Sequence, residues 1–329
     1  MPDSARQVPD AELSALDGEL SIRDGALMGK PVGVTARKLE LGLRLRQLRS
    51  GCGLTIEEAI EGLYGQDEAV PVRQTLNPYI LQRIERGRAT FRYLQDLRGL
   101  AKLYGIENSA VEAELIELQK GAASQDWVTQ YGNNLKPEMQ TFVGVESTAQ
   151  ETRVYHPDLV PGILQTEGYA RARFEQARPI EDTTMAFIDG HVQLRMRRKE
   201  ESILRVEDPP RLEVILGEAA LERRVGSVDI MRQQYAEIVR LSDLENVRIQ
   251  VLPTKSWALQ FAHNFTVLDL GDRLPPTVQV DSAWGAVSMS DKPSEVKRFM
   301  AYFTAMSASA LPPEETPAIM QRLTREIEQ

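Results

Sequence analysis

The chain has 329 residues, a length typical of two domains rather than one. Its 42% hydrophobic and 26% charged residues are typical of a soluble globular protein. No stretch of ~20 apolar residues occurs, and the N-terminus lacks the features of a secretion signal, so we expect no membrane association. Cys52 is the single cysteine, which excludes an internal disulfide and a cysteine-based zinc site and favours the cytoplasm.

Charge is unevenly distributed along the chain, whose net charge is -9. Residues 1–36 carry 3 basic and 6 acidic side chains, residues 37–105 carry 12 and 8, and residues 106–329 carry 24 and 34. The middle segment therefore has a net charge of +4, as a DNA-binding surface requires. The acidic remainder would repel DNA, although +4 over one small segment also lies within ordinary surface variation.

The first third of the chain is predicted to be helical after a polar tail. Residues 1–36 lack an apolar period, so we expect a disordered tail. Leucines at three- to four-residue spacing predict a first helix over residues 36–49. Thr55 and Glu58 have the pattern of a capping box for a second helix that ends at Gly65. The sequence predicts three more helices, which complete a five-helix N-terminal domain over residues 37–121: residues 77–85, 91–104 and 109–120.

The third helix has the pattern of a DNA recognition helix. Asn77 is a good N-cap and Pro78 suits the first helical position, while Gly87 can end the helix. Leu81 and Ile84 lie three residues apart and can pack inward. The remaining arc carries side chains that can contact base edges or phosphates: Tyr79, Gln82, Arg83 and Arg86. A solvated helix face is the alternative interpretation of this pattern.

The pattern changes after residues 121–126, the expected domain joint. Short stretches rich in branched aliphatic residues predict four strands, over residues 211–216, 247–252, 265–270 and 277–280. Helices are predicted between and around them, over residues 166–176, 182–204, 228–241, 293–306 and 317–327. Residues 211–252 form a strand-helix-strand unit of the parallel type. We therefore expect an α+β protein overall, with a mixed α/β domain over residues 127–329.

Two sets of motifs resemble one family. The first set comprises Leu41–Arg49, Gly53–Ala59, Asn77–Arg88 and Leu103–Ile106. The second comprises Tyr155–Arg171, with the unusual segment Val160-Pro-Gly-Ile-Leu-Gln-Thr166, then Gly217–Gly226 and Met231–Gln234. Together they resemble actinobacterial regulators with an N-terminal XRE-type (Cro/repressor-like) helix-turn-helix and a C-terminal antitoxin-like domain.

The resemblance implies roles for residues of the N-terminal domain. It places Arg49, at the end of the first helix, against Glu85, at the end of the recognition helix, as a structural pair. Together with the pattern of the third helix, it implies contacts with double-stranded DNA by Asn77, Tyr79, Gln82, Arg83, Arg86 and Arg88. Arg73 and Gln74, which precede this helix, are added as candidates because of their own side chains. Tyr79, Gln82 and Arg83 are the candidates for base edges, and the others are candidates for phosphates.

The chain departs from the family pattern at two places. Thirteen residues, 64–76, separate the second helix from the recognition helix, where the family has a tight turn. This insertion carries Arg73 and Gln74, and it could lie along the DNA backbone or displace the recognition helix. Ile56 stands where such repressors often carry a glutamine that touches a phosphate, so we expect that contact to be absent.

The sequence offers little for catalysis. His156, His191 and His263 are scattered and lack a metal-ligand spacing, and no nucleophile elbow or phosphate-binding loop occurs. We therefore expect no enzymatic activity, no metal and no cofactor.

The C-terminal domain still offers residues for a ligand pocket, namely Trp127, Tyr155, His156, Gln165, Glu218, Trp257 and Trp284. Packing and turn formation explain most of them equally well. Arg195, Arg197, Arg198 and Lys199 form a basic run that precedes Glu200 and Glu201, which predicts a solvated face with internal ion pairs.

These observations favour a sequence-specific transcriptional regulator that binds DNA with residues 77–85. One short helix offers few base contacts, so we expect a homodimer on two half-sites, with dimerisation or signal sensing in the C-terminal domain. The signal could be a small molecule or, as the resemblance implies, a small protein partner. The alternative is an antitoxin-like protein whose main task is to sequester a protein partner, with DNA binding secondary.

Overall fold

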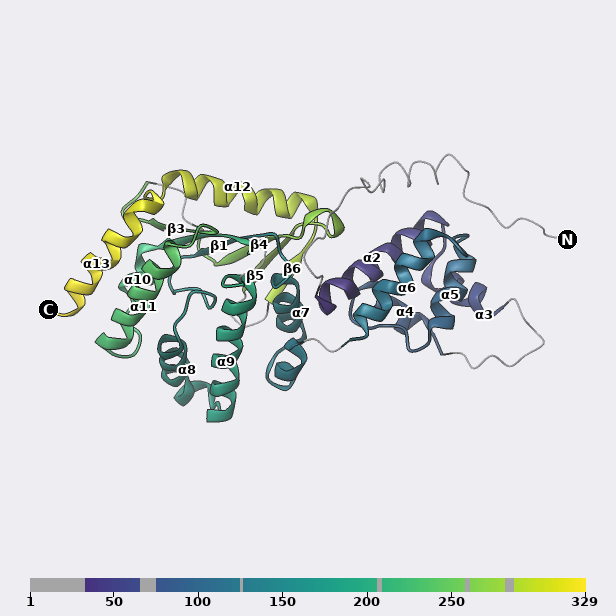
Figure 1. Ribbon diagram of the computed structural model, residues 1–329, viewed down its shortest axis with the longest axis horizontal. Helices are drawn as coiled ribbons and strands as arrows, with labels where there is room; N and C mark the ends of the chain where they lie inside the picture. The colour runs from purple at the N-terminus through teal and green to yellow at the C-terminus, as the bar shows by residue number, and fades with distance from the viewer. Residues whose placement is uncertain (1–32, 66–74, 125–126, 206–208, 258–260, 282–286) are drawn as a thin grey trace. The chain divides into compact units, whose positions relative to one another are not determined.

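The computed structural model describes residues 33–65, 75–124, 127–205, 209–257, 261–281 and 287–329. The chain divides into two compact units, Met1–Asp126 and Trp127–Gln329. The N-terminal unit is helical and the C-terminal unit contains a mixed sheet, so the predicted α+β class is confirmed (Figure 1). No helix in the described ranges is long and apolar enough to cross a membrane.

The N-terminal unit is built from helices that start where the sequence provides a cap. Its helices are α2 (Val34–Gly51), α3 (Ile56–Tyr64), α4 (Pro78–Glu85), α5 (Leu94–Leu103) and α6 (Ala110–Ala122). The Thr55 hydroxyl accepts a hydrogen bond from the Glu58 amide at 3.2 Å, and the reciprocal bond completes the predicted capping box. The Asn77 side chain likewise accepts from the Ile80 amide at 2.9 Å, which fixes the start of α4.

The fourth predicted helix begins three residues later than expected. Phe91 is buried in the core rather than helical, and the Gln119 side chain satisfies its backbone. The Phe91 amide donates to Gln119 Oε1 at 3.1 Å, and Gln119 Nε2 donates to the Phe91 carbonyl at 2.9 Å. A side chain 28 residues away thus replaces helical hydrogen bonds, which no local pattern can predict.

Helices α2 and α4 approach each other closely at Gly42. A β-carbon on Gly42 would lie 2.4 Å from the Ile84 carbonyl oxygen, so a larger residue cannot be accommodated without a shift of the backbone. Next to this contact a fully buried core forms from Leu41, Leu45, Leu81, Ile84, Leu97, Leu100 and Leu115. The inward face predicted for the recognition helix, Leu81 and Ile84, is therefore confirmed.

The C-terminal unit contains a six-stranded sheet in the order β3-β2-β1-β4-β5-β6. Its strands are β1 (Glu151–His156), β2 (Arg211–Gly217), β3 (Val247–Leu252), β4 (Phe265–Asp269), β5 (Thr277–Asp281) and β6 (Val287–Ser290). β1, β2 and β3 are parallel, which confirms the predicted parallel unit over residues 211–252. β4, β5 and β6 continue the sheet in antiparallel pairs from β1.

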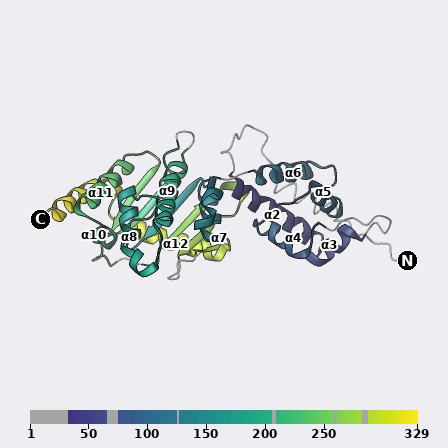
Figure 2. The same cartoon turned by 90° about the horizontal axis from the view of Figure 1, so that it is seen from below.

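Helices cover both faces of this sheet. They are α7 (Pro137–Glu146), α8 (Glu167–Glu181), α9 (Met185–Ser202), α10 (Glu218–Glu222), α11 (Val228–Ser242), α12 (Pro293–Ser309) and α13 (Thr316–Ile327). Short 3-10 helices cover Trp127–Asn134, Gly271–Arg273 and Pro313–Glu315. α12 lies along one face of the sheet, and α8, α9 and α11 lie on the other (Figures 1 and 2).

The alternation of side chains along the strands determines these two layers. On β2, Leu212, Val214 and Leu216 belong to the core shared with α11, whereas Ile215 belongs to the core shared with α12. Successive side chains of a strand point to opposite faces, so the apolar residues of β2 enter the cores on both sides of the sheet. β2 and β3 were predicted from their branched aliphatic residues, although β2 also contains Glu213 and β3 contains Arg248 and Gln250.

Four helices and strands of the C-terminal unit were not predicted: β1, β6, α7 and α10. β1 is central in the sheet but its sequence is polar, because Arg153 pairs with Glu151 at 2.6 Å and with Glu213 of β2 at 3.4 Å. β6 has four residues, too few for a clear pattern. The predicted end of α8 at Gln176 was also too early, since the helix continues through Pro179 to Glu181.

We predict that Gly42→Ala destabilises the N-terminal unit by ~1–3 kcal/mol, because the added methyl group overlaps the α4 backbone. Alanine normally favours a helix over glycine, so this effect has the opposite sign to the helix propensity. Urea unfolding followed by hydrogen exchange of the α2 and α4 amides measures it.

Gly51→Ala is the matched control, because a β-carbon on Gly51, in the last turn of α2, meets no atom within 4 Å. Its stability should equal or exceed that of the wild type. Equal stabilities of the two variants would contradict the assigned close contact.

Candidate nucleic-acid interface

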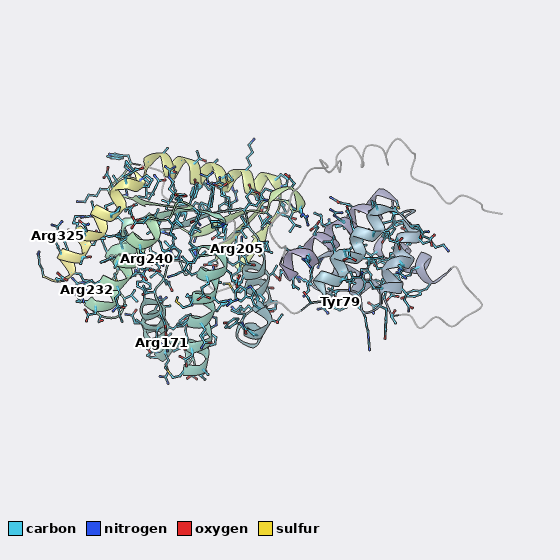
Figure 3. All side chains as sticks on the ribbon, in the orientation of Figure 1. Tyr79, Arg171, Arg205, Arg232, Arg240 and Arg325 are labelled. Atoms are coloured by element: carbon cyan, nitrogen blue, oxygen red, sulfur yellow. The ribbon has the colours of Figure 1, made fainter. Side chains whose placement is uncertain are left out.

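The outer face of α4 presents the side chains predicted to contact DNA. Leu81, Ile84 and Glu85 are buried, whereas the Tyr79 side chain is 66% exposed and projects from the surface of the unit (Figure 3). Several predicted residues are also exposed, namely Asn77, Arg83, Arg86 and Arg88, and Gln82 is half-buried. The structure therefore brings six of the eight predicted DNA-binding residues to one helix and the turn that follows it. The other two, Arg73 and Gln74, lie outside the described residues.

A tight turn at Gly87 ends α4 and positions the arginines beyond it. Gly87 has a φ of +66°, its amide donates to the Ile84 carbonyl at 2.8 Å, and the Arg88 amide donates to the Arg83 carbonyl at 2.8 Å. This pair of bonds is the Schellman motif. A β-carbon here would also lie 2.5 Å from the Leu39 side chain, so both the backbone and the packing require glycine.

The basic side chains of this surface have no acidic partners in the described part of the chain. The Arg83 guanidinium lies 5.7 Å from the centre of the Tyr79 ring, and its Nη2 is 3.4 Å from the Arg88 carbonyl oxygen. Among described residues, no carboxylate forms an ion pair with Arg83, Arg86 or Arg88. These cations are available to an external anion such as a phosphate group.

Two further exposed residues, which the sequence did not single out, follow Arg88 along the chain. Arg92 and Tyr93 are exposed in the loop before α5, and the Arg92 guanidinium lies 5.4 Å from the centre of the Tyr93 ring. In the sequence, basic and aromatic residues alternate after Arg88, and this pattern could have identified Arg92 and Tyr93 as candidates. This combination of a cation and a ring repeats that of Arg83 and Tyr79.

The predicted Arg49–Glu85 pair is present and links the ends of α2 and α4. Arg49 Nε donates to Glu85 Oε1 at 2.6 Å, and Nη2 donates to Oε2 at 2.8 Å. The side chains are 11% and 4% exposed, so the pair is largely excluded from water. The hydrogen bonds to Glu85 raise the pKa of Arg49. Arg49 Nη1 also donates to the Leu54 carbonyl at 2.7 Å, which ties the α2–α3 turn to the same point.

The two ends of the insertion meet at the Tyr64 side chain. The Tyr64 hydroxyl accepts hydrogen bonds from the Thr75 amide at 3.1 Å and the Leu76 amide at 2.8 Å. The Thr75 hydroxyl donates to the Asp96 carboxylate of α5 at 2.7 Å. Because these bonds close the loop at its base, α4 packs on the core although the chain between Gly65 and Thr75 is longer than a tight turn.

Most residues proposed for a pocket in the C-terminal unit do not come together. His156 and Gln165 line one cavity, but Tyr155 points to the opposite face of the sheet, where its ring packs on Phe265. The others lie elsewhere. Glu218 binds Arg322 and the Thr254 amide, Trp127 packs on Tyr131, and Trp257 is fully exposed. Trp284 lies outside the described residues.

The basic run on α9 is not the solvated face that the sequence predicted. Arg197 alone behaves as expected, with ion pairs to Glu200 and Glu201. Lys199 is buried and pairs with Glu237 of α11 at 2.7 Å. Arg195 and Arg198 line the cavity that also contains His156 and Gln165. The prediction was wrong because α9 packs against neighbours on more than one side, which its own sequence does not reveal.

We predict that Glu85→Ala lowers the free energy of unfolding of the N-terminal unit by ~3–5 kcal/mol, since it leaves the Arg49 guanidinium buried without its partner. Urea unfolding with hydrogen exchange at α2 and α4 measures the loss. Glu117→Ala removes the exposed partner of Lys120 and should leave stability unchanged. A Glu85→Ala variant as stable as the control would show that the pair contributes nothing.

Comparison with known proteins yields one match. No curated protein and no solved structure is similar enough to match the chain. A family model described as "Domain of unknown function (DUF5753)" matches residues 139–322. The matched segment covers more than half of the 329 residues and lies within the unit Trp127–Gln329, which holds the sheet and its helices. The chain therefore belongs to the DUF5753 family.

Proposed function

We propose that this protein is a cytoplasmic, sequence-specific DNA-binding transcriptional regulator and that α4 is its recognition helix. One observation carries the proposal. The inner face of α4 is fixed by buried packing and by the Arg49–Glu85 pair, while its outer face presents Tyr79, Gln82 and Arg83. A rigid short helix with aromatic, amide and guanidinium groups on its free face is suited to the major groove of DNA.

The geometry supports different roles for the arginines. Arg83 lies within α4, where its guanidinium can form two hydrogen bonds with a guanine. Arg86 and Arg88 lie on the turn that Gly87 creates, and Arg92 lies on the following loop. These three are suited to phosphate contacts on the edge of the groove, which add affinity without sequence preference.

The size of α4 supports binding as a dimer. The helix has eight residues, and few of its side chains can reach base edges at once. Two copies on half-sites about 34–36 Å apart would double these contacts and multiply the specificity. We therefore propose a homodimer on a DNA site with two-fold symmetry.

In vitro selection from random DNA duplexes with the full chain tests this function. We expect one enriched sequence with two related halves. Arg83→Ala should then weaken binding by ~1–3 kcal/mol per half-site and relax the preference at one position of each half. Arg88→Ala should weaken binding to all sequences about equally and reduce the salt dependence by about one phosphate contact per subunit. Fluorescence anisotropy at several salt concentrations measures both effects.

Lys120→Ala provides the control, because Lys120 is exposed on α6 and paired with Glu117, outside the α4 surface. It should bind the selected DNA as the wild type does. Selection without an enriched sequence would contradict the proposed function. Equal behaviour of the Arg83 and Arg88 variants across mutated sites would contradict the assigned roles.

A further inference from the structure

The C-terminal unit contains a cavity of about 280 Å³ between its sheet and the helices α7, α8 and α9. The sheet register builds its floor. Val154 of β1 pairs with Thr266 of β4, and Thr266 pairs with Gln279 of β5, so these three side chains form one row across three strands. His156 lies two residues beyond Val154, and therefore on the same face of the sheet.

The cavity lies where the strand order changes direction. From β1 the chain adds β2 and β3 on one side of the sheet, whereas β4, β5 and β6 lie on the other side. The cavity is at the carboxyl end of β1, next to the start of β4, because these two strands are antiparallel. Ligands commonly bind at the carboxyl ends of strands in open α/β sheets.

Three arginines of α8 and α9 line this cavity, and one of them is paired with a carboxylate. Arg198 binds Glu146 of α7 through two hydrogen bonds, of 2.7 Å from Nε and 2.8 Å from Nη2. Glu146 is 2% exposed, so this pair is structural. Arg195 and Arg173 form no ion pair with any carboxylate in the described part of the chain.

Arg195 is a partly buried cation whose hydrogen-bonding capacity is largely unused. Its Nε is buried without a hydrogen-bond partner among the described residues, and its Nη1 reaches the His191 carbonyl only at 3.5 Å. The guanidinium lies 4.4 Å from the centre of the Phe174 ring, which holds it in place. A buried charge without a partner is costly, and a bound anion would remove that cost.

The remaining charges around the cavity do not neutralise Arg195. Asp281 accepts hydrogen bonds from Asn264 and Gln279, and Glu181 is exposed at the end of α8. Burial, with the nearby Arg198 and Arg173, lowers the pKa of Arg195, an effect that Asp281 only partly opposes. The positive charge is thus held at an energetic cost until an anion is bound.

Neutral groups complete a binding surface. Burial lowers the pKa of His156, so its imidazole is neutral near pH 7. Its Nδ1 accepts from the Leu159 amide at 3.2 Å, which leaves Nε2 as the donor. The Oε1 atom of Gln165 is buried without a partner among the described residues, and Phe142, Ile163 and Phe174 supply apolar walls.

We propose that this cavity binds a small organic anion, whose carboxylate or phosphate group pairs with Arg195 and Arg173 and whose apolar part packs against Phe174 and Ile163. The volume equals that of about nine water molecules in the liquid, so a molecule of the size of a single substituted ring fits. This assignment concerns residues 139–281 and does not depend on DNA binding by α4.

Binding of three ring compounds of similar shape to the full chain tests the proposal. Benzoate and phenyl phosphate are the anionic probes and benzyl alcohol is the neutral one, each titrated by calorimetry and saturation-transfer NMR. We expect saturable binding of at least one anion, ~10-fold or more tighter than that of benzyl alcohol. If inorganic phosphate competes with the bound anion, the site is assigned to phosphates. If benzoate binds and inorganic phosphate does not compete with it, the site is assigned to carboxylates.

Arg195→Gln should weaken binding of the anion ~10-fold or more. Arg197→Gln is the matched control on the same helix, because Arg197 is exposed and paired within α9, and it should bind as the wild type does. Without ligand, Arg195→Gln should melt at or above the wild-type temperature, since it removes an unpaired charge.

Three binding results would overturn the proposal. They are the absence of saturable binding by both anions, equal binding of benzyl alcohol, and wild-type affinity of Arg195→Gln. A melting temperature of Arg195→Gln below that of the wild type would also overturn it, because Arg195 would then be required for the fold itself. None of these results bears on the DNA selection, so the two proposals can fail independently.

Discussion

The contact between α2 and α4 is the constraint on which the N-terminal unit depends. Gly42 allows the two backbones to approach, and Arg49 joins the end of α2 both to Glu85 and to the Leu54 carbonyl. An eight-residue helix is not stable in isolation, so tertiary contacts must supply its stability. Because all of these tertiary contacts lie on one side of α4, they also determine which side chains of the helix remain exposed to solvent. The surface proposed for DNA is a consequence of how the opposite face packs.

The basic residues of this chain divide into two groups by the presence or absence of a carboxylate partner. Arg49, Arg198 and Lys199 each bind a buried or half-buried glutamate and join two helices. Arg83, on the outer face of α4, and Arg195, in the cavity, have no such partner among the described residues. A cation that is paired inside the protein holds the fold, whereas one held in place without a partner is prepared for an external anion. The two proposed sites rest on this difference.

The local features of the sequence predicted much of this structure. Thr55, Asn77 and Gly87 define helix ends through hydrogen bonds within three or four residues, and these ends were predicted correctly. β2 and β3 were recognised from their branched aliphatic residues, which lie in the cores on the two sides of the sheet. β1 was missed because the charges of Arg153, Glu151 and Glu213 neutralise one another only after β1 and β2 have paired. The cavity was missed for a similar reason, since its floor comes from three strands that are distant in sequence.

The sequence by itself determined the fold class, the caps of the helices and the candidate residues of α4. These features follow from composition and from patterns over a few residues. Only the tertiary structure decided the surroundings of the basic residues on α9. Arg197 faces its own helix neighbours, Lys199 meets α11 and Arg195 faces the cavity. Adjacent positions on one helix point in directions about 100° apart, so residues with the same chemistry reach different surroundings. What surrounds them is set by elements far away along the chain.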